Sequence, residues 1–427
     1  MTPGLAAQVA APPPPGAAVA SGPCLQRPGS ADGPCLQRPG SAGASGPCCQ
    51  RPGWAGAGIA HVPRVSLGVL PTPLVRAARL GPALGLELWV KRDDLAGFVL
   101  AGTKTRALEY LMADALDRGA DTVVGCGGPG SNFCPALAAA AAICGLACEL
   151  VCFGGPAAGA HPNLTSARAW GAQVRFTGSP DRDAVEDAAD ARAAELRAAG
   201  GRPYVVPPGG STAVGAIGAA AAVAELGGGP GGRPPTQIVV GAGSGGTAAG
   251  LLVGVAAEGW PTLVCAASVS RPVDETRSHV LGLARACATR LGTPLPEGSG
   301  LEVHDALAPG FGLAGADARD AAALALRSEG LLLDPTYTAK AVALLVRRAP
   351  DWATGERATG EVVGERATSE RATSEVVSER ATSERVTGEV VSERATRGGP
   401  VVYWHTGGAL GALLSLAEGA PGGAVTF

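Results

Sequence analysis

The stretch Gln237-Ile-Val-Val-Gly-Ala-Gly-Ser-Gly-Gly-Thr-Ala-Ala-Gly250 places a short apolar run directly before a glycine-rich loop and a run of small residues. The apolar run over 237–240 predicts a strand, and the glycines predict a loop that opens a helix. Such a loop lets backbone N–H groups and the positive end of the helix dipole approach an anion closely. The stretch therefore predicts an α/β protein with an anion-binding loop after one strand.

The same alternation of strand and helix continues on both sides of this stretch. Residues 105–118 carry leucine, methionine and alanine at helical spacing and end at Gly119. Further strands are predicted over Leu86–Val90, Thr122–Cys126, Cys148–Phe153, Gln173–Phe176, Leu263–Val269 and Val401–His405. This order is typical of a largely parallel sheet covered by helices, in which ligands bind at the carboxyl ends of the strands.

Composition argues against several classes of protein. The chain has 427 residues, and 34 basic against 37 acidic side chains give a net charge of -3, which does not favour a nucleic-acid partner. No run reaches the roughly 20 apolar residues that span a bilayer, so no membrane contact is expected. Eleven cysteines without a CxxC pair predict reduced thiols, a cytoplasmic protein and no metal site. An organelle transit peptide is the alternative, because residues 1–60 hold three arginines against one aspartate.

Two repetitive segments interrupt the alternation. The motif Gly-Pro-Cys-Leu-Gln-Arg-Pro-Gly at 22–29 recurs at 33–40 and, slightly altered, at 46–53, which predicts a disordered extension over residues 1–60. Residues 354–397 repeat Glu-Arg-Ala-Thr and Glu-Val-Val units with few large apolar side chains. This composition predicts a solvated insertion or a marginal helix.

Lysine is scarce, since Lys91, Lys104 and Lys340 are the only lysines in the chain. Lys104 lies at a predicted helix start after Gly102, where the helix dipole lowers the pKa of an ammonium. A lysine at such a place can form a Schiff base, and a solvated surface lysine is the alternative. Lys91, between a strand and a charged turn, is explained by surface ion pairing, and Lys340 falls on a predicted helix.

Two loops leave more than one interpretation open. Ser131 and Asn132 follow the glycines of a strand-to-helix loop, where they either cap the helix or help to bind a carboxylate. The loop over 241–250 fits G-x-G-x-x-G, but the acidic residue expected about 20 positions later in a dinucleotide site is missing. Arg271 would instead meet a 2'-phosphate, so an NADP-dependent oxidoreductase stays an alternative, as does a tight turn without a ligand.

Nine motifs occur in the order found in D-cysteine desulfhydrases and 1-aminocyclopropane-1-carboxylate (ACC) deaminases, which the chain resembles from about Val65 to Leu416. These are pyridoxal-phosphate enzymes of the tryptophan-synthase-β fold type. The motifs are Lys91-Arg-Asp-Asp-Leu, Gly102-Thr-Lys-Thr-Arg, Leu108-Glu-Tyr-Leu, Cys126-Gly-Gly-Pro-Gly-Ser-Asn, Pro207-Pro-Gly-Gly-Ser, Gly243-Ser-Gly-Gly-Thr, Ser268-Val-Ser-Arg-Pro, Leu333-Asp-Pro-Thr-Tyr-Thr-Ala-Lys and His405-Thr-Gly-Gly.

The resemblance implies a fold, a cofactor and a set of site residues. The fold would have a large domain over 61–103 with 210–427 and a small domain over 104–209, in a homodimer. Lys104 would form the Schiff base with pyridoxal phosphate. The cofactor phosphate would lie in the loop formed by Gly243, Ser244, Gly245, Gly246 and Thr247. Ser131 and Asn132 would bind the substrate carboxylate and the cofactor 3'-oxygen, with Ser131 also in catalysis. Tyr337 would lie near the ring as a further catalytic residue, and Thr406 would lie at the ring nitrogen.

Within that family, Thr338 and Thr406 resemble the desulfhydrases more than the deaminases. The implied reaction is a β-elimination from a small D-amino acid, which releases sulfide, pyruvate and ammonia. An ACC deaminase, another D-amino acid deaminase and a cofactor-binding protein with little activity are the alternatives.

Four positions depart from the family pattern: Thr103 replaces asparagine, Ala107 replaces a phosphate-binding lysine, Phe133 replaces histidine and Phe311 replaces tyrosine. These changes predict weaker phosphate binding, with compensation by Arg106 left open, and a more apolar substrate pocket with Phe133, Phe311, Tyr337 and Thr338 at its wall.

Overall fold

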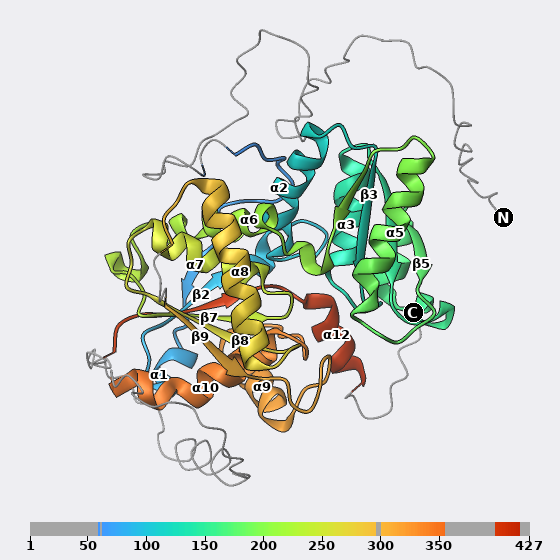
Figure 1. Cartoon of the computed structure of the whole chain (residues 1–427). Helices are drawn as coiled ribbons and strands as arrows, with labels where there is room; N and C mark the ends of the chain where they lie inside the picture. The colour runs from blue at the N-terminus through green and yellow to red at the C-terminus, as the bar shows by residue number, and fades with distance from the viewer. Residues whose placement is uncertain (1–58, 60–61, 296–299, 355–397, 419–427) are drawn as a thin grey trace, which may run out of the picture. The chain divides into compact units, whose positions relative to one another are not determined.

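The larger of two sheets has six strands in the order β1-β2-β10-β7-β8-β9 (Figure 1). Its strands are β1 (Leu74–Arg76), β2 (Leu88–Arg92), β7 (Gln237–Ala242), β8 (Leu263–Ser268), β9 (Leu301–Asp305) and β10 (Val401–His405). β1 is antiparallel to β2, and the other pairs are parallel. This computed structural model describes residue 59 and residues 62–295, 300–354 and 398–418.

The smaller sheet has four parallel strands in the order β5-β4-β3-β6. They are β3 (Thr122–Gly127), β4 (Ala147–Cys152), β5 (Gln173–Phe176) and β6 (Pro203–Val206). All four lie within residues 104–209, and the strands of the larger sheet lie in the two flanking segments. The boundaries of the two expected domains stay a prediction.

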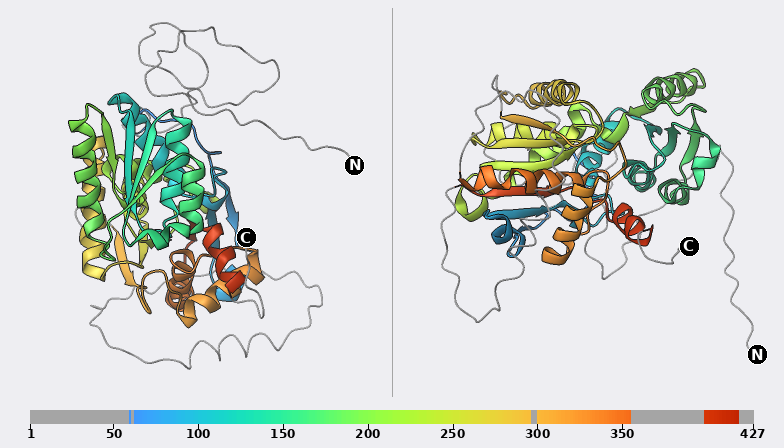
Figure 2. Two further views of the ribbon diagram at one scale, coloured as in Figure 1. Left: turned by 90° about the vertical axis from the view of Figure 1, so that its right-hand side faces the viewer. Right: turned by 90° about the horizontal axis from the view of Figure 1, so that it is seen from below.

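Helices cover both sheets (Figure 2). They are α1 (Leu80–Leu84), α2 (Lys104–Asp117), α3 (Phe133–Ile143), α4 (Pro162–Ala169), α5 (Ala184–Ala198), α6 (Ala213–Ala224), α7 (Gly246–Ala257), α8 (Val273–Leu291), α9 (Ala316–Glu329), α10 (Thr338–Thr354) and α12 (Ala409–Glu418). Short 3-10 turns span Asp93–Leu95, Pro156–Ala160, Pro208–Gly210 and Pro230–Gly232. No helix within the described ranges is both long and apolar enough to cross a membrane.

Alternation along the central strands explains why helices are needed on both faces. On β7, Ile238 and Val240 belong to the core on the side of α6, α7 and α8, whereas Val239 belongs to the core on the side of α9 and α10. A strand with no polar face is stable only when both of its faces are covered. The predicted α/β class with mostly parallel sheets under helices is thus confirmed.

The seven predicted strands are all present, within a residue or two at their ends. The sequence pattern does not indicate β1, β6 and β9, because β1 has only three residues, β6 starts with a proline and β9 alternates apolar with charged side chains. The predictions for residues 1–60 and 354–397 concern segments that, apart from Ile59 and Thr354, lie outside the described residues. Ile59 is buried against the core.

Four strands end where the loops of interest begin. β3 leads into the loop with Ser131, β6 into Gly209 and Gly210, β7 into the glycine loop, and β10 into Thr406. α2 packs against both α3 and α6, so its first residue lies between the loops of the two sheets.

Candidate active site

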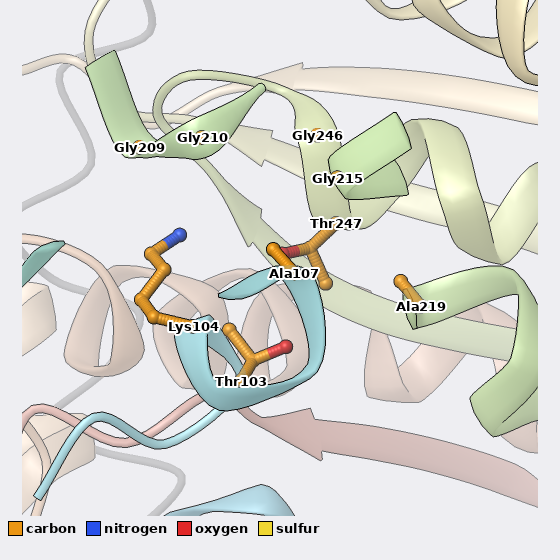
Figure 3. Close-up of a pocket in the computed structure, with 9 residues that line it drawn as sticks. All are labelled: Thr103, Lys104, Ala107, Gly209, Gly210, Gly215, Ala219, Gly246 and Thr247. Carbon is orange, nitrogen blue, oxygen red and sulfur yellow. The ribbon is translucent and has the colours of Figure 1, made fainter. Parts of the chain in front are cut away.

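A cavity lies between the start of α2, the loop after β6 and the start of α7 (Figure 3). Its lining residues come from segments that are far apart in sequence, and only one of them carries a charge. They are Thr103, Lys104, Ala107, Gly209, Gly210, Gly215, Ala219, Gly246 and Thr247. The cavity therefore sets a single ammonium against a wall of backbone amides, hydroxyls and small side chains.

Gly210 of the wall and Gly245, which precedes the wall residue Gly246, both have a positive φ. Gly210 has φ +68°, and a Cβ there would lie 2.8 Å from the ring of Phe133. Gly245, the residue that precedes α7, has φ +84°. A side chain is strained at such positive φ values, so only glycine lets the loops approach each other this closely.

Lys104 is the first residue of α2, and its side chain extends toward Gly209 and Gly210 (Figure 3). The backbone N–H of Thr103 donates to the carbonyl of Thr406 at 3.0 Å, which fixes the start of the helix against the end of β10. Within the described part of the chain, the Lys104 ammonium makes no hydrogen bond or ion pair. Burial lowers the pKa of Lys104 to about 8, although the negative charge of Asp334 opposes this shift. Lys104 is thus a partly neutral amine in a cavity, not the solvated surface lysine of the alternative interpretation.

Asp334 is a further site residue, and its place in the motif over 333–340 did not predict a role for it. It is buried and accepts hydrogen bonds from the backbone N–H groups of Thr336, Tyr337 and Thr338. The Thr338 hydroxyl also donates to the carboxylate at 2.7 Å. Thr338, which was predicted at the substrate, therefore holds Asp334 at the start of α10 and does not line the cavity.

Hydrogen bonds from residues that do not line the cavity hold the glycine loop over 243–247 in place. The Gly243 carbonyl accepts hydrogen bonds from Ser270 Oγ at 2.8 Å and from an Arg271 guanidinium nitrogen at 3.0 Å. The Gly246 N–H donates to Ser211 Oγ at 3.1 Å, and the Ser244 carbonyl lies 3.1 Å from the His279 ring. Arg271 thus has a structural partner, and the phosphate role that the NADP alternative gave it is not needed to explain its position.

The loop after β3 shows local roles for its polar side chains. Ser131 Oγ accepts a hydrogen bond from the Phe133 N–H at 3.2 Å, and Asn132 Oδ1 accepts one from Asn163 Nδ2 at 3.4 Å. Phe133 is only 2% exposed and packs in the core beneath Gly210. None of these predicted site residues lines the cavity, so a substrate contact for them stays a prediction.

Tyr337 and Phe311 form an aromatic pair beside the glycine loop. Their ring centroids are 6.1 Å apart in an edge-on arrangement, and a Cβ on Gly243 would lie 2.6 Å from the Tyr337 ring. The Arg182 guanidinium lies over the Phe311 ring, 4.0 Å from its centroid. Burial raises the pKa of Tyr337, so its hydroxyl is protonated at neutral pH. Like Thr406, both aromatic residues lie outside the cavity lining.

Arg106 does not supply the cation that Ala107 lacks. Its guanidinium is buried and forms ion pairs with Asp93 at 2.8 Å and Glu225 at 2.6 Å. Lys91 pairs with the same Glu225 at 2.6 Å and is fully buried, so the expected surface pairing of Lys91 is wrong. Two cations and two carboxylates thus neutralise one another outside the cavity, and Lys104 is left as its only charged lining residue.

Comparison with known proteins places this site in a family. The family model described as pyridoxal-phosphate dependent enzyme matches residues 65–360. A D-cysteine desulfhydrase from Yersinia enterocolitica is 36% identical over 297 residues, which cover 67% of this chain and 88% of that protein. One from Klebsiella pneumoniae is 36% identical over 292 residues, covering 67% and 89%.

Solved structures agree with the sequence comparison. A structure titled as an ACC deaminase homologue has a TM-score of 0.67 and 29% identity, and the match covers 84% of this chain and 97% of that one. An O-ureido-L-serine synthase, at a TM-score of 0.54 and 18% identity over 86% of this chain and 97% of that one, supports the fold alone. The lysine at the start of α2, the glycine loop at the start of α7 and these matches together show that the chain belongs to the family of pyridoxal-phosphate dependent enzymes.

Proposed function

We propose that the protein is a lyase that uses pyridoxal phosphate to eliminate a β-substituent from a small D-amino acid, with D-cysteine as its substrate and sulfide, pyruvate and ammonia as products. The observation that carries this proposal is the unpaired, partly neutral amine of Lys104, which shares a cavity with the glycine loop of α7. The D-cysteine desulfhydrases among its relatives and the threonines at 338 and 406 support the choice of substrate.

The residues around the cavity fit the cofactor. Thr103 Oγ1 is buried without a hydrogen-bond partner in the described structure. A phosphate in the cavity would accept a hydrogen bond from this hydroxyl. The first turn of α7 has backbone N–H groups without partners inside the helix, and Gly246 and Thr247 of that turn line the cavity. The glycine loop and Thr103 would therefore hold the phosphate, and Lys104 would hold the aldehyde end. Thr406 would lie at the ring nitrogen and Asn132 at the 3'-oxygen.

When bound, pyridoxal phosphate stabilises negative charge on the carbon that bears the amino group of a substrate. The chain must then supply a base for the proton on that carbon. Lys104 Nζ suits this role, because a pKa of about 8 leaves part of it neutral near pH 7 and no side chain holds it elsewhere.

The remaining site residues would orient the substrate. Tyr337 stays protonated at neutral pH, so it would donate a hydrogen bond and not accept the proton. Ser131 would bind the substrate carboxylate beside the N-terminus of α3, where the helix dipole favours an anion. The Phe311 ring against Tyr337 would keep water from that side of the pocket.

An ACC deaminase is the second candidate function, favoured by the 29% identity to the structure titled as an ACC deaminase homologue. It differs from the first candidate in the bond that is broken, and the same residues would bind the cofactor. The homodimer stays a prediction alongside either function.

The deciding experiment compares the wild type with Lys104→Ala and with Lys340→Arg. Lys340 donates to the carbonyls of Leu307 and Gly310 and does not line the cavity, so it is a matched lysine control. Borohydride reduction should attach the cofactor to the peptide that contains Lys104, in the wild type and in Lys340→Arg only. D-Cysteine should yield equal amounts of sulfide and pyruvate with both proteins, and L-cysteine much less.

Three other outcomes of this experiment would contradict the proposal, each in a different way. Cofactor attached to a different lysine would overturn the role of Lys104. Attachment at Lys104 with 2-oxobutanoate from ACC, and no sulfide from D-cysteine, would favour the deaminase. Attachment without product from either substrate would favour the cofactor-binding protein with little activity.

A further inference from the structure

Cys265, Glu302 and His304 lie together on one face of the larger sheet, away from the cavity. Cys265 of β8 pairs in register with Glu302 of β9, and Ala267 pairs with His304. Because side chains alternate along a strand, residues 302 and 304 share a face with 265. Parallel pairing thus brings a thiol together with a carboxylate and an imidazole that lie more than 30 residues further along the chain.

The separations of the ligand atoms match those around a tetrahedral zinc ion. Zinc bonds of about 2.3 Å to sulfur and about 2.0–2.1 Å to oxygen and nitrogen put ligand atoms about 3.3–3.6 Å apart. Here Glu302 Oε2 lies 3.3 Å from His304 Nε2 and 3.8 Å from Cys265 Sγ. All three ligand atoms lie within 4.8 Å of one another, and a bound ion would draw the thiol and the imidazole closer together.

The imidazole nitrogen at this place is only weakly satisfied. His304 Nε2 is shielded from solvent, and among the described residues it meets the Glu302 carboxylate at 3.3 Å without the geometry of a full hydrogen bond. A metal ion between the two groups would bond to both of them. The thiol is buried as well, whereas the Glu302 side chain is 39% exposed and leaves a path from solvent.

The charges around the cluster permit a divalent cation. Arg348 of α10 is the cation whose charge acts on both Cys265 and Glu302. Its guanidinium is paired with Asp351 at 3.0 Å, which offsets its charge. A thiolate and a carboxylate together carry two negative charges, so a divalent ion would leave the site neutral.

We propose that Cys265, Glu302 and His304 form a zinc site in which water completes the coordination. Zinc displaces the thiol proton to solvent and binds the thiolate, with no change in oxidation state. A thiolate with an imidazole favours zinc, or cobalt as its spectroscopic substitute, over magnesium or calcium. The expectation of no metal rested on the spacing of cysteines in the sequence, which does not detect ligands that strand pairing brings together.

The site would fasten the edge of the sheet. β9 is the last strand of the sheet, and it continues directly into the loop that Lys340 holds through the carbonyls of Leu307 and Gly310. Phe311 follows that loop and packs on Tyr337. Zinc would therefore stabilise the strand that carries one side of the aromatic pair, without contact to the cofactor cavity.

The test is Co²⁺ titration of the chelator-treated, full-length holoenzyme, followed through the visible bands of tetrahedral cobalt at wavelengths longer than those of the cofactor. One Co²⁺ per chain should give these bands, and Zn²⁺ should displace it. His304→Ala and Glu302→Gln, both on the edge strand β9, should each weaken binding by more than the about 10–100-fold that loss of an outer-shell partner costs. Cys265→Ser should remove the sulfur contribution, and Cys287→Ser, a buried thiol of α8, should bind as the wild type does.

Bands that persist in His304→Ala and Glu302→Gln would overturn the proposal, because the metal would then be held by other cysteines. Absence of bands in the wild type would overturn it too. The cobalt bands do not depend on substrate turnover, so this test of the zinc site is independent of the proposed lyase activity.

Discussion

At the scale of single residues, Ala107 leaves the cofactor site short of a cation. Ala107 and Thr247 both line the cavity (Figure 3), and Arg106 is held outside by Asp93 and Glu225. Ala107→Lys should add one charge-assisted hydrogen bond to the phosphate, worth about 1.5–3 kcal/mol, and tighten cofactor binding about tenfold to a hundredfold. Cofactor titration of the apo-protein measures this. Ala107→Met is the control for bulk, and an equal gain in both variants would contradict the electrostatic explanation.

The amine of Lys104 makes cofactor attachment depend on pH. With its pKa lowered to about 8, the amine is mainly protonated below that pH and mainly neutral above it, so the attachment rate of the apo-protein should rise through pH 8. Asp334 favours the ammonium, so Asp334→Asn should move the midpoint to lower pH. Stopped-flow absorbance at a series of pH values gives both midpoints. A midpoint that moves upward in Asp334→Asn would show that the carboxylate does not act on Lys104 in this way.

At the scale of elements, Arg106 connects α2 to the end of β2 and to α6. Its partner Asp93 is fully buried and also accepts a hydrogen bond from Trp404 at 2.7 Å. Removing one partner from a buried ion pair leaves an uncompensated charge, so Arg106→Ala should lower the free energy of unfolding by about 3–5 kcal/mol in urea titrations. Arg118→Ala, at an arginine that is 59% exposed and pairs with Asp114, should cost at most about 1 kcal/mol. Equal losses in the two variants would mean that burial does not set the cost.

The elements also show how far the sequence alone leads. The apolar strand β7 and the alanine-rich helices α3 and α6 are predictable from the sequence. These elements are buried on all sides, so almost all of their residues are apolar or small. Lys104 and the glycine loop are predictable because both lie at helix starts. The burial and ion pairing of Arg106 and Lys91 are not predictable, because a sequence motif does not show whether its charged side chains face solvent or one another. Asp334 and the Cys265 cluster are equally hidden, because their partners come from turns and strand pairing.

At the scale of the whole molecule, the repetitive segment over 355–397 is inserted between two residues, Thr354 and Gly398, whose surroundings lie close together in the fold. Thr354 ends α10, and Gly398 lies so close to Trp352 that a Cβ on it would collide with the Trp352 carbonyl. β10 begins three residues later and lies between β2 and β7 in the larger sheet. The two ends of the segment over 355–397 are therefore neighbours, and a few residues are enough to join them.

Replacing residues 355–397 by a short Gly-Ser linker should leave cofactor binding unchanged. Each halving of a loop lowers its closure cost by about 0.6 kcal/mol, so the shortened protein should unfold at the same or a slightly higher temperature. Cofactor titration and thermal unfolding measure both, with a Gly-Ser segment of the original length as the control for sequence. If the shortened protein is insoluble or free of cofactor while the full-length control is loaded, the join strains α10 against β10. If both fail, the repeat itself takes part in the fold, and the prediction of a solvated insertion is wrong.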